Sequence, residues 1–277
     1  MRTLSPKSIA FTGVGVVLGH EFYCAQSAGV GRAAGENAEV AAARGRQGGC
    51  RPSRPFGVSP QTVRRDLRLL EEKGQVHRAY GTARAVETGS FERSWADRQE
   101  SFVAEKTAIA KEAAARAGQA QVLFIDEGFL PSLIPQFLQT RDLTIVTTSL
   151  DTAQKVALLP GVTAIIAGGR VRSITGGVVD HWALQTIGQM TFDLAFIGTN
   201  GISRKGSLST PDPAVASVKR AALTAAKRAI LVADHSKFGH SLFATFGNTS
   251  DVEVVITGRQ LRPVDAGRVP GAPVVRV

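Results

Sequence analysis

Residues 56–84 read FGVSPQTVRRDLRLLEEKGQVHRAYGTAR, and the order of residue types in this stretch predicts a helix followed by a β-hairpin. Ser59 is suited to cap the helix, and Pro60 falls at the first helical position, where its missing N–H costs nothing. An apolar stripe with helical spacing then follows, made of Val63, Leu67 and Leu70. This stripe must face a protein core.

The opposite face of the predicted helix is polar and basic, and Gly74 is suited to end the helix. Residues 75–84 then hold a β-prone run and a turn at Gly81, which is the order of a recognition helix and a wing. Such a helix can read base edges in the major groove, and flanking arginines can meet phosphates. The predicted DNA-binding residues are Ser59, Gln61, Thr62, Arg64, Arg65, Arg68, His77 and Arg78. The alternative is an ordinary solvated surface helix.

The segments VSPQTVRRDLRLLEEKG and HRAYG resemble the DNA-binding signature of the DeoR family of bacterial sugar-metabolism repressors. The resemblance extends over residues 56–258. It implies an N-terminal winged helix-turn-helix joined to a C-terminal domain that senses sugar phosphates.

Composition favours a polyanionic partner. The 277 residues carry a formal net charge of +10, and residues 44–84 hold ten Lys and Arg against three acids. The two cysteines, Cys24 and Cys50, provide neither a disulfide framework nor a metal site. We therefore expect a cytoplasmic protein without a cofactor or a membrane partner.

Residues 1–55 do not share the family pattern. An apolar run at residues 9–19 has the outline of a signal peptide, but it is too short to span a membrane, and His20 and Glu21 stand where small neutral residues belong. Residues 25–55 are dominated by Ala, Gly and Arg, and the helices expected before Phe56 are missing. We expect residues 1–55 to be disordered or a frame-shifted translation. The alternative function is accordingly a degenerate regulator with impaired DNA binding.

The remaining chain predicts an α/β domain. We expect a winged helix-turn-helix remnant at 56–85, a linker at 86–97, an effector-sensing and oligomerisation domain at 98–258, and a tail at 259–277. A helix is predicted from about Ala96 to Ala117, ended by Gly118. Apolar runs alternating with helical segments predict a parallel sheet, with strands at 122–126, 143–149, 163–169, 194–201, 229–234 and 252–257.

Ligands of such sheets bind at the carboxyl ends of the strands. Further motifs there, AFIGTNGI, VKRA and ADHSKFG, also resemble the family, whose sensor domain resembles ribose-5-phosphate isomerase and CoA-transferase folds and binds phosphorylated sugars. Strand ends and resemblance together predict an effector site at Asp126, Gly128, Ser149, Gly198, Gly201, Lys219, Asp234 and Lys237. Two lysines would supply the point charges that a phosphate needs.

Two departures from the family pattern concern this site. Where the family has Asp-x-Gly-Thr-Thr, this chain has DEGFLP at residues 126–131, and Glu127 adds a charge that would repel phosphate. Ala214 and Val215 stand where the family often has glutamates. Either the effector is different and less polar, or ligand sensing has been lost.

An enzyme is the second class of function that the sequence leaves open. An isomerase-like fold could use Asp126, Glu127, Asp234 or His235 for acid–base work. The sequence lacks a nucleophile elbow, a P-loop and a metal-ligand spacing among its five histidines, so no catalytic or metal residues are assigned. We predict a homo-oligomeric repressor of a carbohydrate operon that binds double-stranded DNA and a small-molecule effector.

Overall fold

The structure is a computed structural model of the 277-residue chain, and it forms two units, Met1–Glu87 and Thr88–Val277. The residues it describes are three short N-terminal strands, the helical positions Arg65 and Arg68, a hairpin within 76–85, and residues 95–277 except 140 and 141. Within these residues no helix is both long and apolar enough to cross a membrane.

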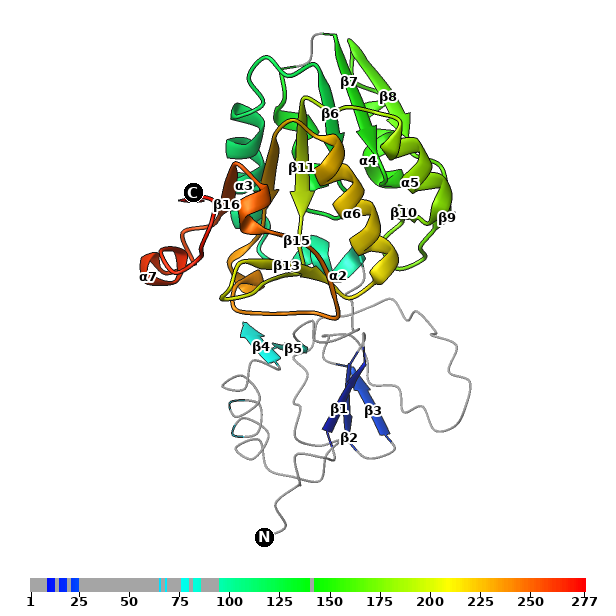
Figure 1. The fold of residues 1–277 in the computed structure, drawn as a ribbon. Helices are drawn as coiled ribbons and strands as arrows, with labels where there is room; N and C mark the ends of the chain where they lie inside the picture. The colour runs from blue at the N-terminus through cyan, green and yellow to red at the C-terminus, as the bar shows by residue number, and fades with distance from the viewer. Residues whose placement is uncertain are drawn as a thin grey trace. The chain divides into compact units, whose positions relative to one another are not determined.

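The first unit contains two small antiparallel sheets (Figure 1). Strands β1 (Ile9–Thr12), β2 (Gly15–Leu18) and β3 (Glu21–Cys24) pair in order. The β-branched and aromatic residues of these strands favour an extended backbone. That residues 1–55 are disordered or a frame-shifted translation stays a prediction. Strands β4 (Val76–Ala79) and β5 (Thr82–Ala85) form the hairpin predicted for the wing.

The second unit is built on a seven-stranded sheet with the order β17-β16-β14-β11-β6-β7-β8, in which every neighbouring pair is parallel. The six predicted strands are confirmed, with small shifts in their bounds. They are β6 (Val122–Ile125), β7 (Leu143–Thr147), β8 (Val162–Ile166), β11 (Leu194–Gly198), β14 (Ala229–Val232) and β16 (Val254–Thr257).

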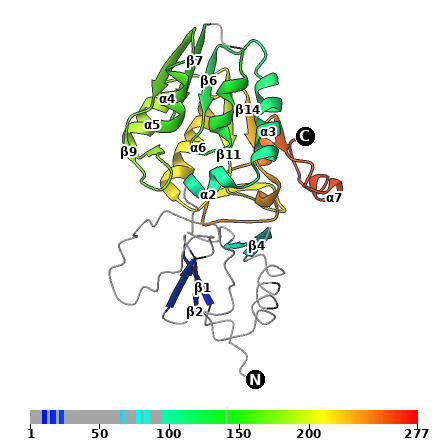
Figure 2. The ribbon, with the colours of Figure 1, turned by 180° about the vertical axis from the view of Figure 1, so that it is seen from behind.

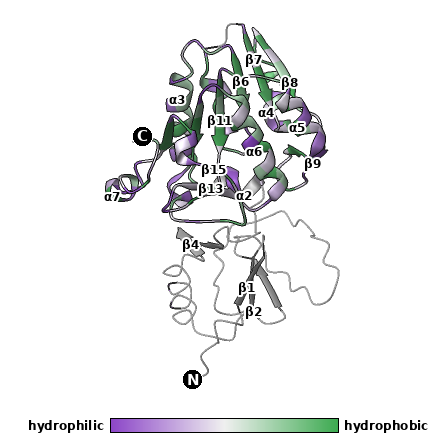
Figure 3. Cartoon of the chain, in the orientation of Figure 1, coloured by the Kyte–Doolittle hydropathy of each residue, from purple (hydrophilic) through white to green (hydrophobic). Residues whose placement is uncertain are grey.

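Helices cover both faces of this sheet, so the unit has three layers (Figures 1 and 2). Because successive side chains point to opposite faces, Phe124 joins one core cluster while Leu123 and Ile125 join the other. Helices α5 (His181–Gly188) and α6 (Pro213–Ala225) contribute to the Phe124 cluster. The other cluster includes residues of α3 (Val103–Ala115), α4 (Leu150–Val156) and the 3-10 turns η2 (Pro131–Leu133) and η3 (Pro135–Phe137). The hydropathy colouring shows the apolar strands between helices with polar outer faces (Figure 3).

Smaller elements complete the second unit. A three-stranded antiparallel sheet contains β12 (Gly201–Ile202), β13 (Ser207–Thr210) and β15 (Ala244–Asn248). Strands β9 (Arg170–Val171) and β10 (Val178–Val179) form a hairpin. The remaining short helices are η4 (His235–Lys237), η5 (Thr249–Asp251) and α7 (Pro263–Ala266).

The helix expected from Ala96 to Ala117 is broken in two. Helix α2 (Trp95–Glu100) ends before Phe102, which has a left-handed backbone (φ 53°), and α3 then begins at Val103. The ring of Phe102 packs edge-on against His235, with centroids 4.7 Å apart. A long-range contact thus accompanies the break, and local helix propensity could not reveal it.

Both ends of the expected sensor domain also differ from the sequence-based boundaries. The supposed tail at 259–277 contains β17 (Val274–Arg276), which pairs with β16 and forms an edge of the sheet. Val274 and Val275 of this strand pack against the two core clusters of the sheet. Trp95, assigned to the linker, begins α2 and packs on the ring of Phe129.

Candidate functional site

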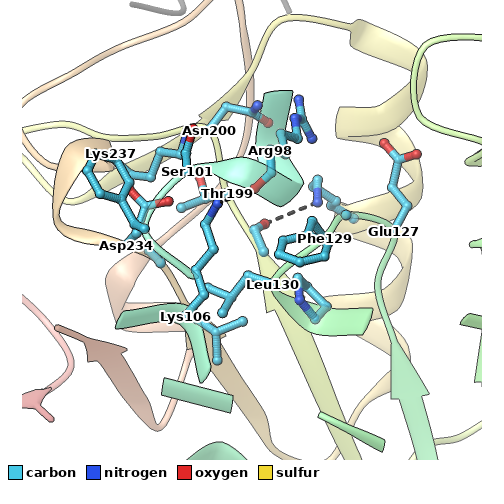
Figure 4. Close-up of a pocket in the computed structure, with 17 residues that line it drawn as sticks. Arg98, Ser101, Lys106, Glu127, Phe129, Leu130, Thr199, Asn200, Asp234 and Lys237 are labelled. Atoms are coloured by element: carbon cyan, nitrogen blue, oxygen red, sulfur yellow. Dashed lines mark hydrogen bonds between the residues drawn. The ribbon is translucent and has the colours of Figure 1, made fainter. Parts of the chain in front are cut away.

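A pocket lies at the carboxyl ends of β6, β11 and β14, where parallel sheets of this class bind ligands (Figure 4). Its volume is about 60 Å³, which is room for only a few water molecules. The lining is Arg98, Ser101, Phe102 and Lys106, residues 127–131, residues 198–200, Lys219, residues 232–234 and Lys237.

The floor of the pocket is a buried ion pair between Lys219 of α6 and Asp126, which directly follows β6. The Lys219 ammonium also donates to the Gly198 carbonyl at 3.1 Å, and the Gly198 N–H donates to Asp126 Oδ2 at 2.9 Å. Among the described residues, no group donates a hydrogen bond to Asp126 Oδ1. Burial raises the pKa of Asp126, and the attraction of Lys219 opposes that rise. The pair therefore presents an oriented lysine to the pocket.

The second acidic group of the pocket is Asp234, at the end of β14. It caps η4 by accepting hydrogen bonds from the N–H and hydroxyl of Ser236. Burial raises its pKa, but Lys237, Lys106 and the Ser236 hydrogen bond more than offset this, so the pKa lies below its usual value. Asp234 is therefore ionised, and its negative charge lies close to the positive charges of Lys237 and Lys106.

The Glu127 carboxylate points away from the middle of the pocket (Figure 4). It accepts a hydrogen bond from Thr175 at 2.7 Å and pairs with Arg172 at 3.4 Å, and both residues are buried. Arg172 also contacts Asp212, the N-cap of α6, at 3.1 Å. Burial is the largest influence on Glu127 and raises its pKa. The Glu127 carboxylate, which was expected to repel phosphate, is thus directed away from the pocket and paired with Arg172.

The sequence analysis did not assign Lys106 and Arg98 to the site. Lys106 is only 5% exposed; its ammonium donates to the Arg98 carbonyl at 2.7 Å and lies 5.4 Å from the centre of the Phe129 ring. Phe129 in turn packs edge-on against Trp95, with centroids 5.9 Å apart. The α2–α3 break turns Arg98 back over the pocket, and the sequence gives no local signal of that break.

Most of the predicted effector residues come together here. Gly128, Gly198, Lys219, Asp234 and Lys237 line the pocket, and Asp126 forms the buried ion pair with Lys219. The other two predicted residues do not line it, namely Ser149 and Gly201.

Ser149 and Gly201 have structural surroundings of their own. Ser149 is the N-cap of α4 and accepts a hydrogen bond from the Thr152 N–H at 3.2 Å. A side chain at Gly201 would approach the His240 carbonyl and the Ser209 hydroxyl to 2.9 Å each. The structure therefore gives each position a role in folding.

Two of the predicted DNA-binding side chains, Arg65 and Arg68, are described, and both are helical and exposed. The backbones of His77 and Arg78 lie in β4. The predicted residues outside the described part of the chain are Ser59, Gln61, Thr62 and Arg64.

Family models match most of the chain. The DeoR C terminal sensor domain matches residues 101–259, and the DeoR-like helix-turn-helix domain matches residues 53–89. The chain belongs to the DeoR family. The resemblance seen in the sequence is thereby confirmed, as is the fold class of an N-terminal helix-turn-helix and a C-terminal α/β domain. Because members of this family are transcriptional regulators, this DeoR-family chain is a DNA-binding regulator rather than an enzyme.

Individual relatives agree with this assignment. The chain is 36% identical over 203 residues to the "Glycerol-3-phosphate regulon repressor" of Escherichia coli (strain K12), covering 73% of this chain and 80% of the relative. The protein of the same name from Haemophilus influenzae is 35% identical over 202 residues, covering 73% and 78%.

Solved structures give weaker matches. A probable sor operon regulator from Shigella flexneri has a TM-score of 0.39 at 14% identity, covering 72% of this chain and 97% of that one. Ribose 5-phosphate isomerase A from Methanocaldococcus jannaschii has a TM-score of 0.34 at 15% identity, covering 48% and 53%.

Proposed function

We propose that this chain represses a carbohydrate-related operon by binding operator DNA through residues 56–85, and that a small phosphorylated metabolite in the sensor pocket changes the DNA affinity. The DNA-contacting residues are Gln61, Thr62, Arg64, Arg65, Arg68, His77 and Arg78, on a helix capped by Ser59. The helix-turn-helix match over residues 53–89 carries the DNA-binding part of the proposal.

Cationic side chains support the effector part. Arg98, Lys106, Lys219 and Lys237 all line the pocket, whose acidic members are already engaged by lysines or by Arg172. Lysine ammonium groups provide the point charges that a phosphate needs. Two relatives are named as glycerol-3-phosphate regulon repressors, so glycerol 3-phosphate is the first compound to test. We therefore limit the proposed effector site to Asp126 and the predicted residues that line the pocket. Ser149 and Gly201 are left out of it.

The proposal includes a cytoplasmic location and a homo-oligomer. Chromosomal DNA is the partner, so the protein must act in the compartment that contains it. Two copies that bind two half-sites together gain affinity because the second contact is intramolecular.

The test is a titration of the full-length protein against its own upstream DNA at several salt concentrations, with and without glycerol 3-phosphate. Each lost phosphate contact should lower the log–log salt slope by about 0.9. We expect Arg65→Ala and Arg68→Ala to weaken binding and reduce this slope. Arg204→Ala, an exposed arginine of the sensor unit, is the matched control and should leave both unchanged.

The degenerate regulator remains the second candidate, and one observation favours it. The helix-turn-helix match begins at residue 53, and the described elements before it are the strands β1 to β3 rather than helices. A recognition helix needs partner helices to hold its apolar stripe. Absence of specific DNA binding at low salt, in a protein whose sensor unit is folded, would favour this candidate over the repressor.

A further inference from the structure

Strand β8 forms one edge of the seven-stranded sheet and pairs with β7 on its inner side (Figure 1). At its two ends the hydrogen bonds to β7 use the Gly161 carbonyl and the Ala167 N–H. Because the backbone groups of a strand alternate between its two sides, Val162, Ala164 and Ile166 direct their N–H and C=O groups outward. No strand in the described part of the chain pairs with that outer side.

The sequence of β8 lacks the features that usually protect an edge. Edge strands of soluble proteins are commonly very short or carry Lys, Pro or a bulge, which prevents pairing with a further strand. The opposite edge of this sheet follows the rule, because β17 has three residues, follows Pro273 and contains Arg276. Strand β8 has five residues, VTAII, with neither a charge nor a proline. Its open edge is therefore suited to accept another strand.

Strand β8 is fixed in place by core packing, and apolar side chains near it are exposed. Val162 and Ala164 pack against one core cluster, and Ile165 packs against the other. Ile166 is 39% exposed, and Leu158, in the turn before the strand, is 84% exposed. A rigid strand loses little conformational entropy when it binds, and burial of these side chains would add to the backbone hydrogen bonds of an added strand.

A second copy of the chain fits this edge because β8 is self-complementary. Two copies related by a two-fold axis at Ala164 run antiparallel, so Val162 faces Ile166 of the partner subunit. The outward backbone groups then form about six N–H···O=C bonds across the axis. The strand has no charged residue, so the pairing brings no like charges together. A two-fold axis closes after two copies, which ends the assembly at a dimer.

We propose that β8 pairs with β8 of a second copy, so that two seven-stranded sheets become one continuous sheet through a dimer. The inference deepens the homo-oligomer of the proposed function and rests on it. The pocket lies at β6, β11 and β14, and β7 separates β8 from β6 in the sheet order. An effector can therefore enter the pocket without opening this dimer contact.

Sedimentation velocity of the full-length protein over a range of concentrations measures the association. We expect the parent to reach a plateau at the dimer mass. Ile166→Lys places a charge on the edge, and Ala164→Pro removes an outward N–H that the pairing with β7 does not use. Each should raise the dissociation constant of the dimer at least ten-fold, and thermal unfolding verifies that each variant is folded.

The matched control is Val264→Lys. Val264 is 51% exposed in α7, so the variant makes the same apolar-to-lysine change away from β8. It should dimerise as the parent does.

A disulfide trap tests the pairing register. In a Cys24→Ser, Cys50→Ser background, Ala164→Cys places two thiols opposite each other across the axis. Hydrogen-bonded antiparallel pairs have Cα atoms about 5.5 Å apart, a separation that a disulfide spans. Oxidised glutathione should therefore produce a cross-linked dimer with Ala164→Cys and none with Val264→Cys. Absence of the Ala164→Cys cross-link would exclude the register centred on Ala164.

Three results would overturn the inference. They are a parent that stays monomeric, an oligomer that Ile166→Lys and Ala164→Pro leave intact, and a mass that rises with concentration without a plateau. Operator titration on the same preparations separates these failures from failure of the proposed function. Specific operator binding by a parent whose oligomer resists both variants would contradict the β8 contact alone. A dimer that both variants weaken, in a protein that does not bind DNA, would support the β8 contact and contradict the repressor.

Discussion

The buried pair of Lys219 and Asp126 allows a quantitative test of how the pocket floor is held. The two side chains are 4% and 0% exposed. Lys219→Met removes the cation and leaves a buried carboxylate without its partner, which costs about 3–5 kcal/mol in comparable cases. With a urea m-value of about 2 kcal/mol/M, the unfolding midpoint should fall by about 1.5–2.5 M.

The destabilisation should also depend on pH. Burial already raises the pKa of Asp126 while Lys219 opposes the rise, so removing Lys219 raises this pKa further. A folded-state pKa above the unfolded value gives stability that is fully present below the unfolded pKa and is lost as pH rises through the folded pKa. The defect of Lys219→Met should therefore be smaller at pH 5 than at pH 8.

Tryptophan emission in urea is the assay, since Trp95 and Trp182 both belong to the unit Thr88–Val277. The double variant Asp126→Asn with Lys219→Met removes both charges and should recover much of the loss. Lys227→Met is the control: its pair with Asp193 has side chains 65% and 32% exposed, so the change should stay below about 1 kcal/mol. The reasoning would be refuted if Lys219→Met lowered the free energy of unfolding no more than Lys227→Met does. It would also be refuted if the double variant regained none of the lost stability.

Two further predictions concern neighbouring clusters. A Cβ at Gly177 would lie 1.4 Å from Glu127 Oε2, so Gly177→Ala should cost about 1–3 kcal/mol in the same urea assay, whereas Gly188→Ala, with nothing within 4 Å, should cost nothing. The hydrogen bond to Glu105 raises the pKa of His235, so its stabilisation is full below about pH 6.5 and is lost as pH rises through the folded pKa. The difference in Tm between the parent and His235→Asn should thus shrink from pH 6 to pH 9, and a constant difference would count against the pair.

The sequence predicted the layered sheet well because its signal is local. The strand parts of the runs at 122–126, 194–201 and 229–234 (VLFI, LAFIG and AILV) contain no polar side chain, as expected for strands buried on both faces, and helical segments separate several of the runs. The same reasoning predicted that Asp126, Gly198 and Asp234 share one edge, because parallel strands end together. The wing at 76–85 was also recognisable, from its β-prone residues and turn.

The edge strand β17 was missed because Val274 and Val275 form a run too short to predict a strand by themselves. Strand β16 provides its pairing partner. Ser149 and Gly201 were included because they follow strands. Neither lines the pocket, and the structure shows a helix cap at Ser149 and a close backbone approach at Gly201. Position after a strand therefore identifies the edge of the sheet, but it does not identify which side chains reach a ligand.

The sequence by itself determined the family and the parallel sheet, and it singled out Asp126, Lys219 and Asp234, since these depend on motifs and on periodicity along the chain. Only the tertiary structure decided that the helix breaks at Phe102, that Lys106 and Arg98 enter the pocket, and that Glu127 turns away to Arg172. These features arise from contacts between residues distant in sequence, including Phe102 with His235 and Glu127 with Thr175. Local propensity carries no information about such contacts, because their energy exists only once the sheet has brought the partners together.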